Sequence, residues 1–321
     1  MHGAATAIVV VAVLVATITP AGRGLSPFSF AFDLERRSAS DAILNFLLFL
    51  PLGLTLAWGG RSAIAAGLFG FLLASIIEIA QTFLPGREPA LSDIVFNALG
   101  AAGGALIMRW RRVLVAPDAK TSARLSVISL SLAASILIAT GWLLAPIQGS
   151  GGIFIARSGE DVVLRYASRA TAFGFDQPEY RREGVFGPRG SGESATVSAS
   201  GDPSRWEVSI GTDRATLGPT VGQGWALLAY PDAIGRRWGT IVSGVWLLVI
   251  FLPVGIWARG RFLPVAATVS ILLLAVLPTI TGLAPTTGLE WLGAVTGFLA
   301  GAVLRVSRRS TPLSRAPAHI D

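Results

Sequence analysis

Long runs of apolar residues divide the chain, and they restrict its fold more than any other feature of the sequence. A helix needs about 20 apolar residues to cross ~30 Å of hydrocarbon, and lipid leaves the polar groups of an open backbone unsatisfied. About eight runs approach this length, at residues 4–20, 42–58, 62–84, 92–110, 125–146, 239–257, 262–281 and 287–306. Only 14% of the residues are charged, against roughly 25% in soluble domains. We therefore expect an all-α polytopic membrane helical bundle with about eight transmembrane helices.

The first run, 4–20, has two interpretations. An apolar stretch of this length near the N-terminus also suits a cleaved signal peptide. No positively charged residue precedes the run, which favours a retained helix. Both interpretations stay open.

Arginines gather at the ends of the apolar runs, and they account for the net charge of +7. This placement is typical of membrane anchors on the cytoplasmic side rather than of a nucleic-acid surface. The most basic short loop lies between Arg109 and Arg124. Placing that loop in the cytoplasm puts both termini there, and it puts residues 21–41, 85–91, 148–238 and 282–286 outside. Every strong basic cluster agrees with this topology. The clusters comprise Arg109, Arg111, Arg112, Arg124, Arg259, Arg261, Arg305, Arg308, Arg309 and Arg315.

Residues 148–238 differ from the rest of the chain in composition. Alternating segments such as 161–166 and 205–210 are separated by Gly, Ser and Pro, a pattern typical of short strands and turns. We expect a small β-rich extracytoplasmic domain inserted between helices 5 and 6. The sequence then divides into a transmembrane domain of helices 1–5 (1–147), the β-rich domain (148–238), C-terminal helices 6–8 (239–308) and a cytoplasmic tail (309–321).

The residue types exclude several kinds of chemistry. The chain has no cysteine, which excludes disulfides, thiolate catalysis and cysteine-ligated metals. Its two histidines, His2 and His319, lie near the ends of the chain. We therefore expect no metal site and no cofactor, and membrane lipid is the first partner to expect.

Polar residues recur at helical spacings inside the apolar runs of residues 41–104. Spacings of three, four and seven place side chains on one face of a helix. With the topology above, the polar faces of three consecutive helices lie near the outer membrane surface. An intramembrane carboxylate costs about 2.5–3.5 kcal/mol on insertion scales, so Glu78 needs a partner, and Arg87 is our choice for Glu78 or Asp93. The predicted polar cluster comprises Asp41, Asn45, Glu78, Gln81, Arg87, Asp93 and Asn97.

Structural roles compete with functional ones at most of these positions. Asp41 and Asp93 follow serines at helix starts, so each is also suited to capping. Asn45 and Asn97 are equally suited to cross-linking helices. The small-residue spacing of Gly100 and Gly104 favours helix packing, and Pro51 and Gly53 are assigned to packing as well. Glu78 and Gln81 have the weakest structural explanation.

A faint internal repeat is also present. The sequence Phe49-Leu-Pro-Leu-Gly53 recurs as Phe251-Leu-Pro-Val-Gly255, and Gly100 and Gly104 recur as Gly297 and Gly301. Helices 6–8 are then a degenerate copy of helices 2–4. Chance resemblance between apolar helices is the alternative.

The order Asp41-x3-Asn45-x3-Phe49-x-Pro51-x-Gly53, Ser75-x2-Glu78-x2-Gln81, Gly86-Arg87, Ser92-Asp93, Asn97-x2-Gly100-x3-Gly104 resembles the VanZ-like membrane protein family. The resemblance covers roughly residues 30–110. It implies a multi-pass protein of the bacterial cytoplasmic membrane. The family takes its name from a teicoplanin-resistance protein, so lowered sensitivity to glycopeptide antibiotics is implied as well.

The leading hypothesis is a cell-envelope protein whose outer polar cluster binds or modifies a cell-surface ligand, such as a cell-wall precursor, a glycan or a glycopeptide. An enzyme acting on a lipid-linked envelope precursor is an alternative, with Glu78 and Asp93 as the catalytic candidates. A proton-coupled transporter is a second alternative. A glycan-binding surface protein, using aromatic residues of 148–238, is a third.

Overall fold

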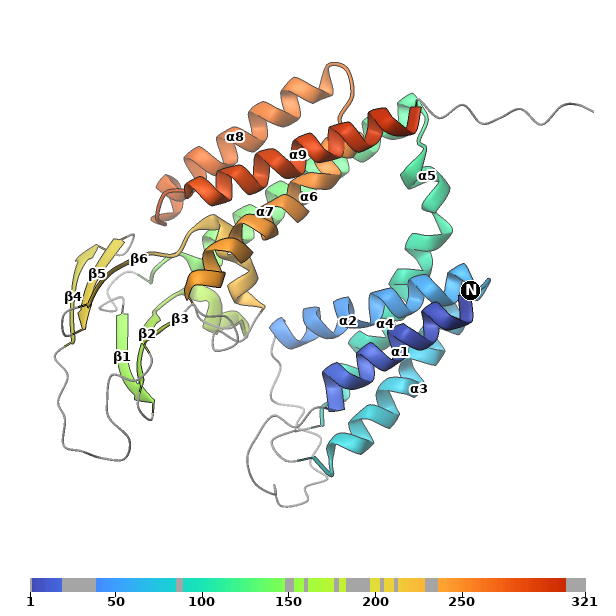
Figure 1. Cartoon of the computed structure of the whole chain (residues 1–321), viewed down its shortest axis with the longest axis horizontal. Coiled ribbons are helices and arrows are strands. Elements are labelled where there is room, and N and C mark those ends of the chain that lie inside the picture. The colour runs from blue at the N-terminus through green and yellow to red at the C-terminus, as the bar shows by residue number, and fades with distance from the viewer. Residues whose placement is uncertain are drawn as a thin grey trace, which may run out of the picture. The chain divides into compact units, whose positions relative to one another are not determined.

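The computed structural model describes residues 2–18, 39–84, 89–147, 153–158, 161–175, 179–182, 197–202, 205–210, 213–228 and 236–309. Two compact units make up the chain (Figure 1). The first comprises Met1–Pro117 and Phe173–Phe175, and the second comprises Asp118–Ala172 and Asp176–Asp321. Each unit contains its own set of packed helices.

The first unit is a helical bundle. Its helices are α1 (His2–Ile18), α2 (Ala39–Trp58), α3 (Ala63–Gln81), α4 (Leu91–Arg109) and the short α5 (Arg111–Val115). Helix α4 packs along α2 and α3, and α1 packs against α2 and α3 (Figure 1). Phe49, Leu52, Ile77 and Ala101 are buried in the core, where Val13 of α1 joins them. Large apolar side chains also cover the outside of α3, which suits a helix that faces lipid.

The contact between α2 and α4 depends on glycine. A Cβ atom at Gly100 would overlap the carbonyl oxygen of Phe46, and one at Gly104 would overlap that of Leu50. Gly53 on α2 lies in the same way against the carbonyl oxygen of Ala101. Small residues at this spacing let two helix backbones approach closely, and helices in lipid associate through such packing.

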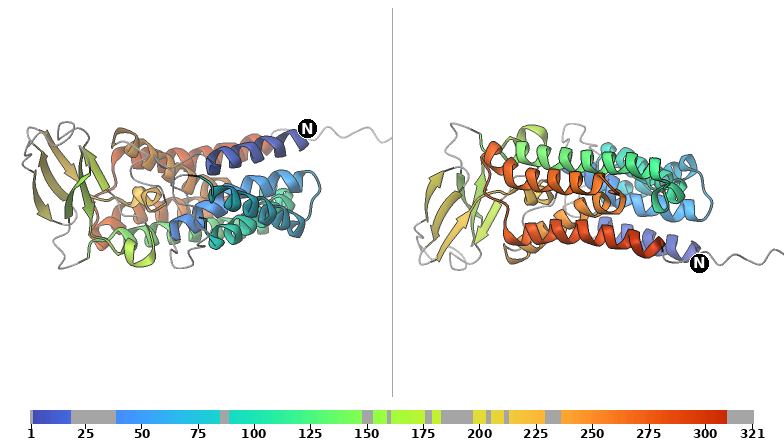
Figure 2. Two further views of the ribbon diagram at one scale, coloured as in Figure 1. Left: turned by 90° about the horizontal axis from the view of Figure 1, so that it is seen from below. Right: turned by 90° about the horizontal axis from the view of Figure 1, so that it is seen from above.

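The second unit also contains a helical bundle. Helices α6 (Ala119–Leu144), α7 (Arg236–Trp257), α8 (Phe262–Thr281) and α9 (Gly288–Arg309) form it. Helix α7 packs along α9, and α6 packs against α7 and α8 (Figure 2). Asp118 caps α6, because its carboxylate accepts a hydrogen bond from the backbone N–H of Thr121. This hydrogen bond lowers the pKa of the Asp118 carboxyl group.

Helices α7 and α9 repeat the contact between α2 and α4 residue by residue. Cβ atoms at Gly297 and Gly301 would overlap the carbonyl oxygens of Leu248 and Leu252, and one at Gly255 would overlap that of Phe298. Each α7 position is 202 residues beyond its α2 counterpart (46 and 248, 50 and 252), and each α9 position is 197 beyond its α4 counterpart (100 and 297, 104 and 301). The two pairs therefore share one packing register.

Between α6 and α7 the chain forms strands and two short 3-10 helices. Strands β1 (Ile153–Ser158), β2 (Asp161–Tyr166) and β3 (Glu179–Arg182) make one antiparallel sheet, in the order β1-β2-β3. Strands β4 (Val197–Asp202), β5 (Arg205–Ile210) and β6 (Asp213–Leu217) make another, in the order β4-β5-β6. The 3-10 helices are η1 (Arg169–Phe173) and η2 (Val221–Leu227). The alternating segments of the sequence thus form strands.

Six helices of the described residues are long and apolar enough to cross a membrane: α2, α3, α4, α6, α7 and α8. The apolar runs of the sequence predict about eight such helices. Helix α1 is apolar but has only 17 residues, and α9 carries Glu290 in its first turn and Arg305 near its end. The predicted boundary at residue 147 also differs from the division between the compact units, which falls after Pro117, so α6 packs with the second unit.

Candidate functional site

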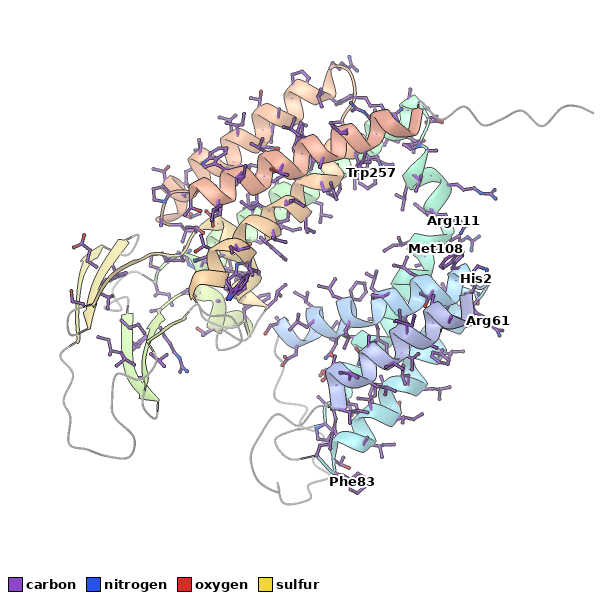
Figure 3. All side chains as sticks on the ribbon, viewed as in Figure 1. His2, Arg61, Phe83, Met108, Arg111 and Trp257 are labelled. Carbon is purple, nitrogen blue, oxygen red and sulfur yellow. The ribbon has the colours of Figure 1, made fainter. Side chains whose placement is uncertain are left out.

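The polar residues of the first unit lie at one end of its bundle. We call the set Asp41, Asn45, Glu78, Gln81, Asp93 and Asn97 the polar end; it combines the start of α2, the end of α3 and the start of α4. At the opposite end, the rings of His2 and Trp58 contact each other with centroids 4.8 Å apart. Figure 3 shows Phe83, just beyond α3, at the far end of this unit from His2 and Arg61. Three consecutive helices therefore contribute polar groups to one region.

Glu78 is a buried carboxylate that binds the start of the next helix. Its side chain is 2% exposed, and its Oε2 accepts a hydrogen bond of 2.8 Å from the backbone N–H of Ala90. Ala90 is the N-cap of α4 and has no capping side chain of its own. A carboxylate at this position satisfies an orphan N–H and interacts favourably with the positive end of the helix dipole. Glu78 therefore fixes α4 against α3.

Replacing Glu78 with alanine is expected to destabilise the first unit by about 1–3 kcal/mol, because the partly buried N–H of Ala90 would lose its acceptor. Glu78→Gln keeps an amide oxygen at that place and is expected to cost less. Thermal unfolding of the purified chain in detergent, followed by tryptophan fluorescence, measures both variants. Equal melting temperatures for Glu78→Ala and wild type would contradict the assigned contact.

Asp93 joins α4 to α2. Its carboxylate accepts hydrogen bonds from the Asn45 amide on α2 and from the Ser92 hydroxyl, the latter at 3.3 Å. Asp41 lies close enough to Asp93 for the two carboxylates to repel each other. Helix α4 begins at Leu91 with Ala90 as its N-cap, so neither Ser92 nor Asp93 is the capping residue. Two carboxylates and an amide therefore meet where α2 and α4 begin.

Asn97 lies one turn farther into the bundle on α4. Its side chain is 2% exposed, and its Oδ1 is buried without a hydrogen-bond partner in the described part of the chain. A buried acceptor without a donor costs about 1–3 kcal/mol, and such atoms are rare. The Asn97 side chain can thus accept a hydrogen bond that the described residues do not supply.

Gln81 ties the end of α3 to α1. Its Nε2 donates a hydrogen bond of 3.0 Å to the backbone carbonyl of Thr17, and its side chain is buried. A short piece of the segment between α6 and α7 also belongs to this unit: the carbonyl of Gly174 accepts a 2.8 Å hydrogen bond from the N–H of Ala39, at the start of α2.

The other predicted residues fall into two groups. Gly53, Gly100 and Gly104 lie in the α2–α4 contact described above, whereas Pro51 is inside α2 and exposed. Arg87, our predicted partner for Glu78 or Asp93, lies outside the described residues. Nothing in the described residues groups three or more His, Asp or Glu side chains as a metal site would require.

A second buried carboxylate, Glu290, is not part of the predicted polar cluster. It is 1% exposed, and it accepts hydrogen bonds from the hydroxyl of Thr220 and, at 2.8 Å, from the backbone N–H of Thr287. The pattern Thr287-x-x-Glu290 is a capping box at the start of α9. That spacing was visible in the sequence, but Thr220 is 70 residues away and no local pattern marks it.

Several apolar helices, arranged in bundles with polar groups at their ends, make this chain a multi-pass membrane protein. Residues 6–113 match the VanZ/LLP1 family model. Residues 6–113 are therefore similar to this family, and the resemblance stated from the sequence is confirmed for this part of the chain. The matched region contains every residue of the polar end. No curated protein matches the chain, and no solved structure matches it.

Proposed function

We propose that this VanZ-like protein is located in the bacterial cytoplasmic membrane and that its polar end faces outward, where it binds a cell-surface ligand. Binding of a cell-wall precursor, a glycan or a glycopeptide there lowers the sensitivity of the cell to glycopeptide antibiotics. The family match over residues 6–113 supports this choice.

The observation that carries the proposal is the unsatisfied acceptor beside two carboxylates. Oδ1 of Asn97 is buried without a donor among the described residues, one helical turn from Asp93. Asp93 and Asp41 add negative charge at the same end. Acceptors of this kind bind N–H and O–H groups, which peptides and sugars carry in abundance. A purely structural cluster would satisfy its own buried groups.

The distribution of charge supports the outward orientation. Arg61 follows α2, and Arg109, Arg111 and Arg112 lie at the end of α4 and in α5. These four arginines are at the end of the bundle opposite to the polar end. Arginine-rich short loops stay in the cytoplasm, so the polar end is expected outside.

The experiment expresses the chain in a teicoplanin-susceptible host. Expression of the wild-type chain is expected to raise the inhibitory concentration of teicoplanin. Asp93→Asn, which removes the charge and keeps the shape, is expected to return that concentration to the value of the empty host. Gly288→Ala is the control, because a Cβ at Gly288 meets nothing within 4 Å. Full protection by Asp93→Asn, at equal amounts of protein in the membrane, would rule out this site.

A labelling experiment tests the orientation separately. The chain has no native cysteine, so a single introduced cysteine gives an unambiguous signal. Phe83→Cys marks the polar end, and Val113→Cys marks the opposite end, where the four arginines lie. The side chains of Phe83 and Val113 are 67% and 46% exposed. A membrane-impermeant maleimide is expected to label Phe83→Cys in intact spheroplasts and Val113→Cys only after permeabilisation. The reverse pattern would invert the topology.

A further inference from the structure

In the second unit, a segment of the chain itself occupies the end of the bundle. The Thr220 hydroxyl donates a hydrogen bond to Oε1 of Glu290, and Nε1 of Trp225 donates one of 3.0 Å to Oγ of Ser243. Gly222 lies so close to Glu290 that a Cβ atom would overlap the carboxylate. A short peptide with two donors and a glycine backbone therefore fills this place.

The shared packing register shows which residues of the first unit correspond to the two acceptors. Positions of α7 lie 202 residues beyond those of α2, so Ser243 corresponds to Asp41. Positions of α9 lie 197 residues beyond those of α4, so Glu290 corresponds to Asp93. The two groups that hold the segment in the second unit are thus represented in the first unit by two neighbouring aspartates.

The N-cap amide of the fourth helix is satisfied differently in the two units. In the second unit Glu290 itself accepts the N–H of Thr287 while it holds Thr220. In the first unit the corresponding N–H, that of Ala90, is accepted by Glu78 of α3. Aspartate is one methylene shorter than glutamate, and Asp93 bonds across to Asn45 of α2 instead. Glu78 thus performs the capping role, and the carboxylate of Asp93 lies on the side of α2.

The acceptors of the first unit carry more negative charge than those of the second. Ser243 is neutral, whereas its counterpart Asp41 is a carboxylate beside the carboxylate of Asp93. Such a pair favours a cationic donor at the place where the second unit binds the neutral indole N–H of Trp225. The buried Oδ1 of Asn97 has no hydrogen-bond partner among the described residues and can accept one from a ligand nearby.

We propose that the polar end of the first unit binds a peptide-like ligand carrying a positively charged amine, in the way that the second unit holds its own residues 220–225. This inference rests on the proposed function and specifies its ligand class. The amine lies between Asp41 and Asp93, and the amide groups of the ligand lie toward Asn97.

The test uses the full-length chain in lipid nanodiscs and two synthetic peptides. Both have the sequence of residues 220–225 with Trp225→Lys, an acetylated N-terminus and an amidated C-terminus; in one of them the lysine Nζ is acetylated. Isothermal titration calorimetry is expected to show that the charged peptide binds about tenfold more tightly than its acetylated twin, a difference of about 1.4 kcal/mol. Asp41→Asn is expected to abolish this preference, and Ser243→Ala is expected to retain it.

Three results would overturn the inference: no binding of either peptide, equal binding of both, or an undiminished preference in the Asp41→Asn variant. Asp93→Asn provides a second isosteric variant if the first does not fold. The outcome is separable from that of the teicoplanin experiment. Loss of protection in Asp93→Asn without peptide binding would leave the proposed function intact and refute this ligand class. Peptide binding together with full protection in Asp93→Asn would support this ligand class and refute the proposed function.

Discussion

Gly104→Ala and Gly301→Ala are each expected to destabilise the protein by about 1–3 kcal/mol or more, because an added methyl group forces two packed helices apart. The Cβ at Gly104 would overlap the carbonyl oxygen of Leu50, and that at Gly301 would overlap the carbonyl oxygen of Leu252. Backbone atoms cannot rotate away as the end of a side chain can. Thermal unfolding in detergent and the yield of monodisperse protein measure the loss.

A matched control lies on the same helix as Gly301. Gly288 in the first turn of α9 has nothing within 4 Å of an added Cβ, so Gly288→Ala is expected to unfold at the wild-type temperature or slightly above it, since alanine favours helix. If Gly301→Ala and Gly288→Ala unfolded at the same temperature, the close α7–α9 contact would be incorrect. The same comparison applies to Gly104 and the α2–α4 contact.

Glu290→Ala is expected to destabilise the second unit strongly. It removes the acceptor of two donors, the Thr220 hydroxyl and the Thr287 N–H. A buried donor such as the Thr220 hydroxyl costs about 1–3 kcal/mol when it is left unsatisfied, whereas the Thr287 N–H is only partly buried. Glu290→Gln retains one amide oxygen, so its melting temperature is expected to lie between those of Glu290→Ala and wild type. Thermal unfolding again provides the measurement.

A double-mutant cycle isolates the contact between Glu290 and Thr220. Thr220→Val removes the hydroxyl but keeps the shape of the side chain. If the two groups are bonded, the destabilisations by Glu290→Ala and Thr220→Val combine to less than their sum, by about 0.5–3 kcal/mol. Strict additivity would mean that η2 does not bind α9 through this pair.

The apolar runs and motif spacings predict much of the fold. Run length and small-residue spacing depend only on the local chain, and most helices begin and end within three residues of the predicted runs, whereas α6 begins at Ala119, before the predicted residue 125. The spacing of Gly100 and Gly104 likewise predicts a packing face, and both glycines lie against the backbone of α2. The alternating segments 161–166 and 205–210 form β2 and β5.

The contacts of the polar residues are less accessible from the sequence. Helical spacing indicates that Glu78 faces the bundle interior, but one of its partners is a backbone N–H, which every residue except proline supplies. No sequence pattern distinguishes Ala90 as that partner. The bond from Thr220 to Glu290 joins segments that only tertiary packing brings together. The sequence motifs already give both offsets of the repeat, 202 from Gly53 to Gly255 and 197 from Gly100 to Gly297, but only the structure shows that both helix pairs pack through these positions.

The bond between Thr220 and Glu290 has a consequence for how the sequence can vary over time. Loss of either side chain leaves the other buried without this hydrogen bond. The two positions are 70 residues apart, and substitutions at them are expected to occur together. Glu78 constrains the residue type at position 90 less, because every residue except proline supplies the backbone N–H that Glu78 binds. Positions 220 and 290 are therefore expected to covary among related sequences, whereas positions 78 and 90 are not.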